Sequence, residues 1–224
     1  GDKPSRYDEA VGYLKMLAEK SKEAKIIEMG ETYEKRKLYC ILISSKENLS
    51  RIDDIKNAIS QLADPRKISE ITAINISEST PAIAWMAYGI HGDELSSTDA
   101  SLQLAYQLAA GTDENTVNLK KELVILIDPM ENPDGRERTL AQLQQLSGEI
   151  INSDVQSIQH TGIWPGGRGN HYLFDSNRDW FALTHPETRA RVKTVLYWNP
   201  QIFVDSHEMG SFDTYLFSPA GPPL

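Results

Sequence analysis

His91 and Glu94 stand three residues apart in the segment YGIHGDELSS, directly after an apolar run. An imidazole and a carboxylate placed this closely can bind one metal ion. Alternatively, the histidine belongs to a turn, and the glutamate lies at a helix start because the helix dipole favours negative charge there. The pair alone leaves both interpretations open, so the decision depends on the rest of the chain.

His207 follows the run QIFVDS in the same way that His91 follows AIAWMAYGI. In an open α/β sheet, functional sites gather at the carboxyl ends of the strands. We therefore expect His207 to lie close to His91 and Glu94, although it comes much later in the chain. Two imidazoles and one carboxylate are a ligand set of catalytic zinc that leaves a fourth position for water. Zinc in such a site polarises a carbonyl group and lowers the pKa of its water.

The composition limits the class of protein. With 224 residues, of which 40% are apolar and 25% charged, the chain is typical of one globular domain with a substantial core. Its 32 acidic residues outnumber its 23 basic ones without any basic block, so we exclude nucleic acid as a partner. No stretch approaches the roughly 20 apolar residues that a membrane span needs. Cys40 is the single cysteine, and we expect it to be a buried, inert thiol.

Short apolar runs alternate with helical patterns along the chain. Five runs are expected to be strands: KIIEM, KLYCILIS, AIAWMAYGI, LVILI and QIFV. Several lack polar alternation, which indicates strands buried on both faces of a sheet. Amphipathic spacing predicts helices around residues 10–17, 52–62 and 95–110, the second behind Ser50 and the third ended by Gly111. This alternation predicts an α/β fold with a largely parallel sheet.

Three segments in the second half of the chain carry further expectations. The stretch from about 131 to 182 is rich in Gly, Asn, Asp and Arg, and we expect a long functional loop there. After it, Thr184 and Glu187 have the spacing of a capping box, which predicts a helix start. The final segment YLFSPAGPPL stops just after a strand-like run and has no closing helix, so we expect a chain that is cut within its fold.

Two motifs occur in the expected loop, ENPDGRERT at 131–139 and FDSNRDW at 174–180. Together with the HxxE pair before them and His207 after them, they resemble the zinc carboxypeptidases of the carboxypeptidase A and B type. The resemblance covers nearly the whole chain and is weakest at residues 46–80. It implies a three-layer α/β/α sandwich with a mostly parallel mixed sheet. Residues 1–224 would then be the N-terminal portion of a single catalytic domain, truncated after the third zinc ligand.

The resemblance implies the ligands of the metal and of the substrate. His91, Glu94 and His207 match the ligands of one zinc ion per chain. Asn177 and Arg178 match the pair that grips the terminal carboxylate of the substrate. A planar guanidinium suits this task because it can donate two parallel hydrogen bonds to a carboxylate.

Two further residues match supporting roles. Asp175 matches the carboxylate that orients the first zinc histidine and fixes its tautomer. Arg168, in GGRGNHY, lies where the family has the catalytic arginine that stabilises the oxyanion of the tetrahedral intermediate. Arg136 and Arg138 are the alternative candidates for that arginine.

Simpler interpretations exist for several of these residues. Residues 132–135 make an excellent turn by themselves, because proline presets φ and glycine accepts a positive value. Asp175 and Arg178 could form a surface ion pair worth about 0 to 1 kcal/mol. The other histidines are expected to face solvent or cap a helix: His160, His171 and His185. Three tryptophans are expected in the core or in a pocket wall: Trp164, Trp180 and Trp198.

Two features depart from the family pattern. Digestive members carry an arginine between the zinc histidine and the glutamate, whereas this chain has Gly92 and Asp93. The HGDE form is closer to some bacterial members and to related amidase-like deacylases. The family's general-base glutamate and substrate-capping tyrosine are expected beyond Leu224. Glu208 is not expected to replace that base, because neighbouring residues of a strand point to opposite faces.

The chain is therefore interpreted as a zinc-dependent metallocarboxypeptidase that hydrolyses C-terminal peptide bonds with a zinc-activated water. Its expected partner is a peptide, or a peptide-like molecule, with a free C-terminal carboxylate. The resemblance implies a secreted or periplasmic protein. Two other functions stay open: a zinc amidase or deacylase acting on N-acyl amino acids or cell-wall peptides, and a non-catalytic peptide-binding pseudoenzyme.

Overall fold

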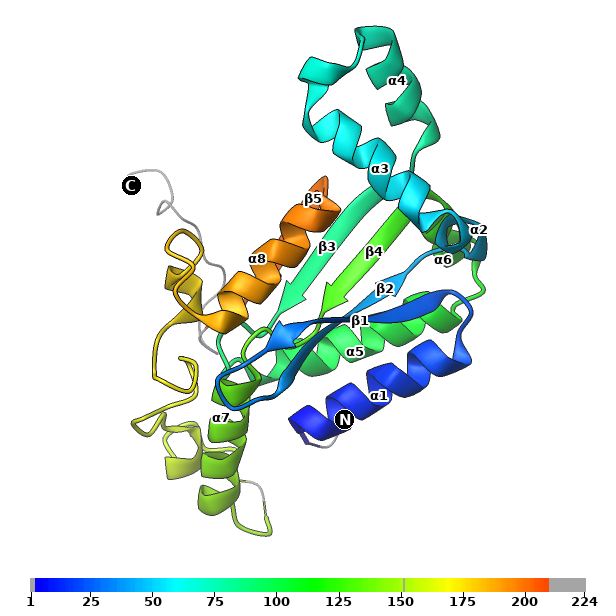
Figure 1. Ribbon diagram of the computed structural model, residues 1–224. Helices are drawn as coiled ribbons and strands as arrows, with labels where there is room; N and C mark the ends of the chain where they lie inside the picture. The colour runs from blue at the N-terminus through cyan, green and yellow to red at the C-terminus, as the bar shows by residue number, and fades with distance from the viewer. Residues whose placement is uncertain (1–2, 151, 210–224) are drawn as a thin grey trace, which may run out of the picture.

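The five apolar runs form the strands of one mixed sheet in the computed structural model, which describes residues 3–150 and 152–209 (Figure 1). The strands are β1 (Ala24–Glu31), β2 (Lys37–Ile43), β3 (Ala82–Tyr88), β4 (Leu123–Asp128) and β5 (Ile202–Ser206). Their order across the sheet is β1-β2-β4-β3-β5. The final segment YLFSPAGPPL, with its predicted strand-like run, lies outside the described residues.

Four of the five strands run in the same direction. The neighbours β4, β3 and β5 are mutually parallel, whereas β2 is antiparallel to both β1 and β4. The predicted α/β fold with a mostly parallel mixed sheet is therefore confirmed. The parallel half of the sheet matters for function because its three carboxyl ends meet at one edge.

Helices cover both faces of the sheet, which gives the predicted three layers (Figure 1). The helices are α1 (Tyr7–Lys20), α2 (Lys46–Ser50), α3 (Ile52–Ala63), α4 (Glu70–Ser79), α5 (Leu95–Ala110), α6 (Glu114–Glu122), α7 (Pro133–Leu146) and α8 (Pro186–Trp198). Short 3₁₀ turns are η1 (Pro65–Lys67), η2 (Ile158–His160) and η3 (Ser176–Arg178). The helices predicted around 10–17, 52–62 and 95–110 are α1, α3 and α5, and Gly111 caps the last of them.

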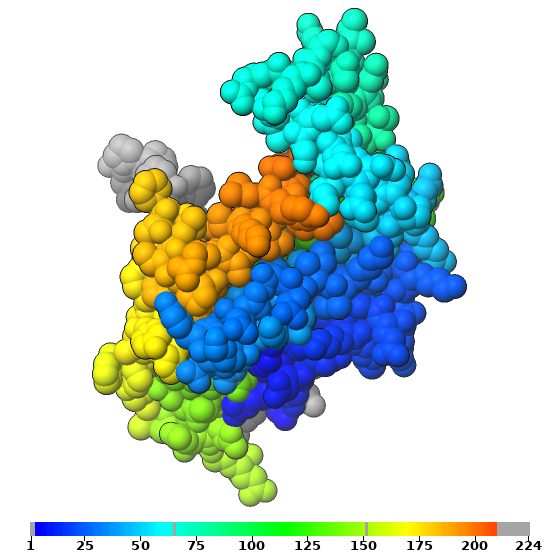
Figure 2. Space-filling view, viewed as in Figure 1, coloured from blue at the N-terminus to red at the C-terminus, as the bar shows by residue number. Residues whose placement is uncertain are grey.

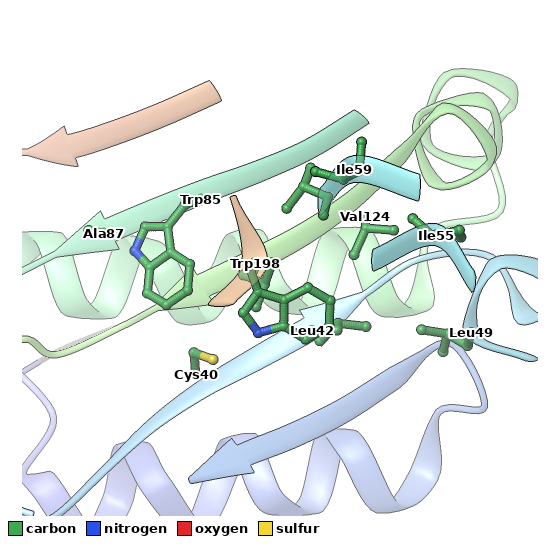
Figure 3. Close-up of a cluster of buried hydrophobic side chains, with 11 residues drawn as sticks. Cys40, Leu42, Leu49, Ile55, Ile59, Trp85, Ala87, Val124 and Trp198 are labelled. Carbon is green, nitrogen blue, oxygen red and sulfur yellow. The ribbon is translucent and has the colours of Figure 1, made fainter. Parts of the chain in front are cut away.

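Alternating side chains of the central strands build two separate cores. On one face, Cys40, Leu42, Trp85 and Leu126 pack under α2, α3 and α8, where Trp198 closes the cluster (Figure 3). On the other face the core consists of strand and helix residues from β2, β4, α1 and α5: Ile41, Ile43, Ile125, Ile127, Leu14, Leu17, Ala105 and Leu108. Each large side chain buried here contributes about 1.5–3 kcal/mol. Both faces of the central strands are buried, which explains why their sequences are continuous apolar runs.

Residues 133–146 form α7, so the prediction of one long loop over 131–182 is wrong in its first third. Asn132 is the N-cap, and its side-chain oxygen accepts a hydrogen bond of 2.9 Å from the Gly135 amide. Pro133 occupies the first helical position, where its missing N–H costs nothing. The segment predicted as a turn is thus a capped helix start.

The start of α8 also differs from the prediction. Its N-cap is His185, and Thr184 does not form a capping box with Glu187. The buried carboxylate of Asp179 instead accepts hydrogen bonds from the amide and hydroxyl of Thr184 and from the His185 amide, at 2.6 to 2.9 Å. A charged acceptor seven residues before the first residue of the helix replaces the local cap, and a pattern of spacing does not reveal it.

Helix α4 and the end of α3 project from the rest of the molecule as a lobe (Figure 2). α4 has no buried residue, and Ile71 and Ile74 are exposed on it. Within the described part of the chain, no helix is long and apolar enough to cross a bilayer.

Candidate metal centre

The predicted metal ligands lie at the carboxyl edge of the parallel strands. β3 and β5 are neighbours whose register pairs Tyr88 with Ser206. His91 comes three residues after the end of β3, in the turn before α5, and His207 directly follows β5. Glu94 is the N-cap residue of α5, but its side chain makes no capping bond and turns toward the histidines instead.

The three side chains converge as predicted. The Nδ1 atom of His91 lies 2.6 Å from Glu94 Oε1, and the Nδ1 atom of His207 lies 3.2 Å from Glu94 Oε2. The two imidazole rings are 4.9 Å apart at their centroids. Among the described residues, these three form the only group of at least three histidine, cysteine or acidic side chains whose ligand atoms lie within 4.8 Å of one another.

The distal nitrogen of His91 contacts Asp175, the residue predicted to orient it. His91 Nε2 lies 3.1 Å from Asp175 Oδ1, and His91 itself is almost fully buried. Asp175 is held in turn by the Asn177 amide, which donates to Oδ1, and by the Arg168 guanidinium, which donates to Oδ2. With a metal bound, a carboxylate at Nε2 would keep the proton of the neutral imidazole there and leave the Nδ1 lone pair for the metal.

The charges of the site favour a cation between the three side chains. Burial alone would lower the pKa of His91, but its hydrogen bond and charge interaction with Glu94 outweigh burial and raise the pKa. Burial would raise the pKa of Glu94, but the hydrogen bond with His91, the Glu208 amide and the two histidines lower it. The carboxylate is therefore held ionised, and a cation between it and the two imidazoles would be stabilised by its charge.

Glu208 points away from this cluster, as expected for the residue after His207. Its carboxylate accepts hydrogen bonds of 2.7 to 3.1 Å from the Ser96 amide, the Ser96 hydroxyl and the Ser97 amide at the start of α5. Its own amide donates to Glu94 Oε2 at 3.0 Å. Glu208 thus supplies the helix cap that Glu94 does not, and it ties the end of β5 to α5. Sequence spacing gave no signal for this role.

Of the three candidate arginines, only Arg168 lies at the cluster. The buried guanidinium of Arg136 bonds to the carbonyls of Ser5 and Leu95 and to Asp99. Arg138 donates to four backbone carbonyls of the 166–171 loop. Both side chains are therefore committed to structural bonds, whereas Arg168 is about half-exposed beside Asp175.

Glycines bring the Arg168 loop against His91. A Cβ atom on Gly92 would overlap the backbone of Gly135 and Arg136 and the Gly167 carbonyl oxygen. Asn132 also donates a hydrogen bond of 3.1 Å to the Arg168 carbonyl, which fixes the loop to the start of α7. The glycine at position 92 is therefore a packing requirement here, because a Cβ atom does not fit there.

Asn177 and Arg178, the predicted substrate ligands, lie in η3 beside the cluster. Asn177 Nδ2 is 3.2 Å from His207 Nε2, and Asn177 Oδ1 accepts a hydrogen bond from the Trp180 indole. The exposed Arg178 bonds only to the Asn177 carbonyl and has no ion-pair partner among the described residues. The alternative of an Asp175–Arg178 surface pair is wrong, since Asp175 pairs with His91 and Arg168.

The other candidate residues lie away from the cluster. His160 is exposed, and His171 pairs with Glu34 at the surface. His185 occupies the N-cap position of α8 without a side-chain capping bond. Trp198 is in the core as predicted. The prediction for Trp164 is wrong, because its side chain is 83% exposed.

A groove of about 1020 Å³ begins at Glu94 and Arg168 and extends along α7. Its walls are formed by α7, by residues 159–163 and by the N-terminal segment before α1. Glutamines are prominent in its lining: Gln142, Gln144 and Gln159. Leucines of α7 line it as well, so the groove offers both apolar surface and hydrogen-bonding groups, and it is larger than a single amino acid requires.

The donor set of the cluster suits zinc. Tetrahedral ligands at 2.0 to 2.2 Å from zinc lie about 3.4 Å from one another. The Nδ1 atoms of the two histidines lie 2.6 to 3.4 Å from the oxygens of Glu94, close to that spacing. Two neutral imidazoles and one carboxylate are also the ligand types that catalytic zinc takes.

Comparison with solved structures places the chain among carboxypeptidase folds. Carboxypeptidase A from Helicoverpa armigera matches 94% of this chain at 17% identity, with a TM-score of 0.58, over 47% of its own length. A metallo-carboxypeptidase from Burkholderia cenocepacia matches 91% at 16% identity, with a TM-score of 0.58, over 41% of its own length. A metallo-carboxypeptidase from Pseudomonas aeruginosa matches 91% at 13% identity, with a TM-score of 0.58, over 40%. The chain thus spans less than half the length of each.

Sequence comparison agrees with the fold. No curated protein matches the chain. The sequence model of the zinc carboxypeptidase family, however, matches residues 11–218, which include every residue of the cluster described above. With its mixed α/β sheet and its match over most of its length, this chain belongs to the zinc carboxypeptidase family.

Proposed function

We propose that this protein is a zinc-dependent metallocarboxypeptidase that removes C-terminal residues from peptides. The observation that carries the proposal is the convergence of His91, Glu94 and His207 at the carboxyl edge of the sheet. These side chains would hold one zinc ion. When bound, zinc supplies a Lewis acid that polarises the scissile carbonyl and makes water a better nucleophile near neutral pH.

Arg178 and Asn177 are the proposed ligands of the substrate's C-terminal carboxylate. Arg178 is exposed and has no ion-pair partner among the described residues, so its guanidinium is free to donate two hydrogen bonds. Asn177 is within 3.2 Å of His207, so a carboxylate held by this pair would place the last peptide bond beside the metal ligands. Fixing that distance is itself a large part of catalysis.

Arg168 is the proposed stabiliser of the developing oxyanion. Its guanidinium is 3.2 Å from Asp175, which also contacts His91, so one carboxylate orients both groups. A donor that is fixed before reaction stabilises new negative charge without reorganisation.

The groove along α7 favours a peptide over a small N-acyl amino acid. It starts at Glu94 and Arg168 and does not include Asn177 or Arg178 in its lining. A chain whose carboxylate is held by the latter pair would leave the site past Arg168 and enter this groove. The Pseudomonas relative was solved with (2-guanidinoethylmercapto)succinic acid, a ligand that bears carboxylates. We further propose, from family resemblance, that the protein works outside the cytoplasm.

Product analysis of the protein at its full natural length tests this function. Zinc-loaded protein is incubated with a peptide that ends in a free carboxylate and, separately, with the same peptide ending in an amide. Mass spectrometry identifies the products. We expect stepwise loss of single C-terminal residues from the first peptide only. Cleavage of an N-acyl amino acid with both peptides left intact would favour the deacylase alternative. Saturable binding of the first peptide without any cleavage would favour the pseudoenzyme.

A further inference from the structure

His207 has different neighbours at its two ring nitrogens. Nδ1 faces Glu94, at 3.2 and 3.4 Å from its two oxygens. Nε2 faces Asn177 Nδ2 at 3.2 Å and Asp205 Oδ2 at 3.5 Å. Since Nδ1 faces the same carboxylate as His91 does, Nδ1 is the nitrogen that would bind the metal. A neutral imidazole that gives one nitrogen to a metal carries its proton on the other. Nε2 of His207 would therefore be an N–H donor that needs an acceptor.

Asn177 does not provide that acceptor. The indole N–H of Trp180 is a donor only, and it lies 3.2 Å from one amide atom of Asn177, which must therefore be the oxygen. The atom that faces His207 is then the amide nitrogen. With a proton on Nε2, two N–H groups would oppose each other. The remaining polar neighbour is Asp205, whose carboxylate accepts hydrogen bonds.

Asp205 is in a position to act on His207 because of the strand geometry. It is two residues before His207 at the end of β5, so both side chains leave the same face of the strand. Its side chain is only 19% exposed. A separation of 3.5 Å is long for a hydrogen bond, but such contacts tighten in occupied catalytic sites.

A buried group of charges lies on the other side of the Asp205 carboxylate. Asp205 Oδ1 is buried without a donor, and it lies within reach of the carboxyl of Glu131. Burial first, and then the nearby charges of Asp128 and Asp205, raise the pKa of Glu131 well above its usual range. Glu131 in turn contacts the Arg191 guanidinium, at 2.5 Å from its Nε, so the acid that faces Asp205 is itself fixed by a buried cation.

We propose that Asp205 is the positioning residue of His207: it accepts the Nε2–H hydrogen bond and thereby directs Nδ1 toward Glu94 and the metal. This role parallels the contact of Asp175 with His91 on the other side of the cluster. It also releases the Asn177 amide from His207, which leaves its N–H groups for the substrate carboxylate. The proposal rests on the proposed zinc site.

Zinc affinity measured by competition with a chromophoric chelator tests the role of Asp205. Loss of such an outer hydrogen bond typically weakens metal binding 10- to 100-fold. We expect that loss for Asp205→Ala, and a smaller loss for Asp205→Asn, whose amide oxygen still accepts a hydrogen bond but without charge. The absorption spectrum of bound Co²⁺ should change in both variants. Urea unfolding of the same samples verifies that each variant is folded.

Two matched variants and one reference separate the possible causes. Asp128→Asn alters the buried group of Asp128, Glu131 and Arg191 without removing a neighbour of His207. This variant should keep native zinc affinity. Asn177→Ala should also keep it, since the proposal assigns no metal-positioning role to Asn177. Native affinity in Asp205→Ala, or an equal loss in Asp128→Asn or Asn177→Ala, would overturn the proposal. His207→Ala is the reference. If this variant retained zinc, the proposed metal site itself would be contradicted. If His207→Ala lost zinc but Asp205→Ala kept its zinc affinity, only the proposed role of Asp205 would be contradicted.

Discussion

Replacing Arg178 by alanine is expected to weaken binding of a peptide with a free C-terminus by roughly 100-fold. Two hydrogen bonds to a charged group are together worth about 3 kcal/mol, which corresponds to that loss in affinity. Arg178 is exposed and free of ion pairs within the described residues, so the substitution removes little from the fold. The measurement is calorimetric titration of the zinc-loaded protein with a peptide whose last amide is replaced by a methyleneamine, which cannot be hydrolysed.

Three comparisons make the Arg178 result specific. The same peptide with a C-terminal amide should bind native protein as weakly as the free acid binds Arg178→Ala. Arg178→Lys should recover only part of the affinity, because an ammonium is a point charge without the forked geometry. Arg66→Ala, on the exposed turn η1, should bind normally. Unchanged affinity in Arg178→Ala would show that the carboxylate is held elsewhere.

Replacing Arg191 by methionine is expected to destabilise the protein by about 3–5 kcal/mol at pH 8. Arg191 is fully buried on α8, 3.4 Å from Asp128 and 2.5 Å from Glu131, which are buried as well. Removing one partner of a buried ionic group leaves charge without compensation. Urea unfolding monitored by circular dichroism measures the change. Lys193→Met, on the exposed face of the same helix, should alter stability by no more than about 0.5 kcal/mol.

The pH dependence of this deficit follows from the buried acids. Burial, opposed by Arg191, raises the pKa of Asp128 to about 6, compared with about 3.9 for an unfolded aspartate. An acid with a raised folded pKa contributes stability that is present below its unfolded pKa and is lost as pH rises through the folded value. Without Arg191 the buried acids ionise at still greater cost, so the deficit of Arg191→Met should shrink from pH 8 to pH 5. A deficit independent of pH would mean that Arg191 acts through packing alone.

The sheet and the convergence of His91, Glu94 and His207 were predictable because each rests on a short-range signal. Strands buried on both faces leave continuous apolar runs, and the edge where β3 and β5 end is a general site in such sheets. Helix α7 was missed because its start, Asn-Pro-Asp-Gly, has the composition of a turn. Only the fold reveals that Asn132 caps a helix and holds the Arg168 carbonyl.

The sequence did not reveal the roles of residues whose partners lie far away along the chain. Glu208 caps α5 from more than a hundred residues away, and Asp179 replaces the predicted Thr184 cap. Arg168 could be separated from Arg136 and Arg138 only after their backbone partners were seen. For Asp205 a signal did exist. Side chains two residues apart on a strand share a face, so Asp205 lies on the same face as His207, whereas the adjacent Glu208 does not.

Zinc content per chain tests the central claim most directly. Elemental analysis is made after dialysis against trace zinc, on the native protein, on His207→Ala and on His171→Ala, which removes an exposed histidine that pairs with Glu34. We predict close to one zinc per chain in the native protein and in His171→Ala, and none above background in His207→Ala. Absence of zinc from the native protein, or full retention in His207→Ala, would contradict the proposal that His91, Glu94 and His207 form a metal centre.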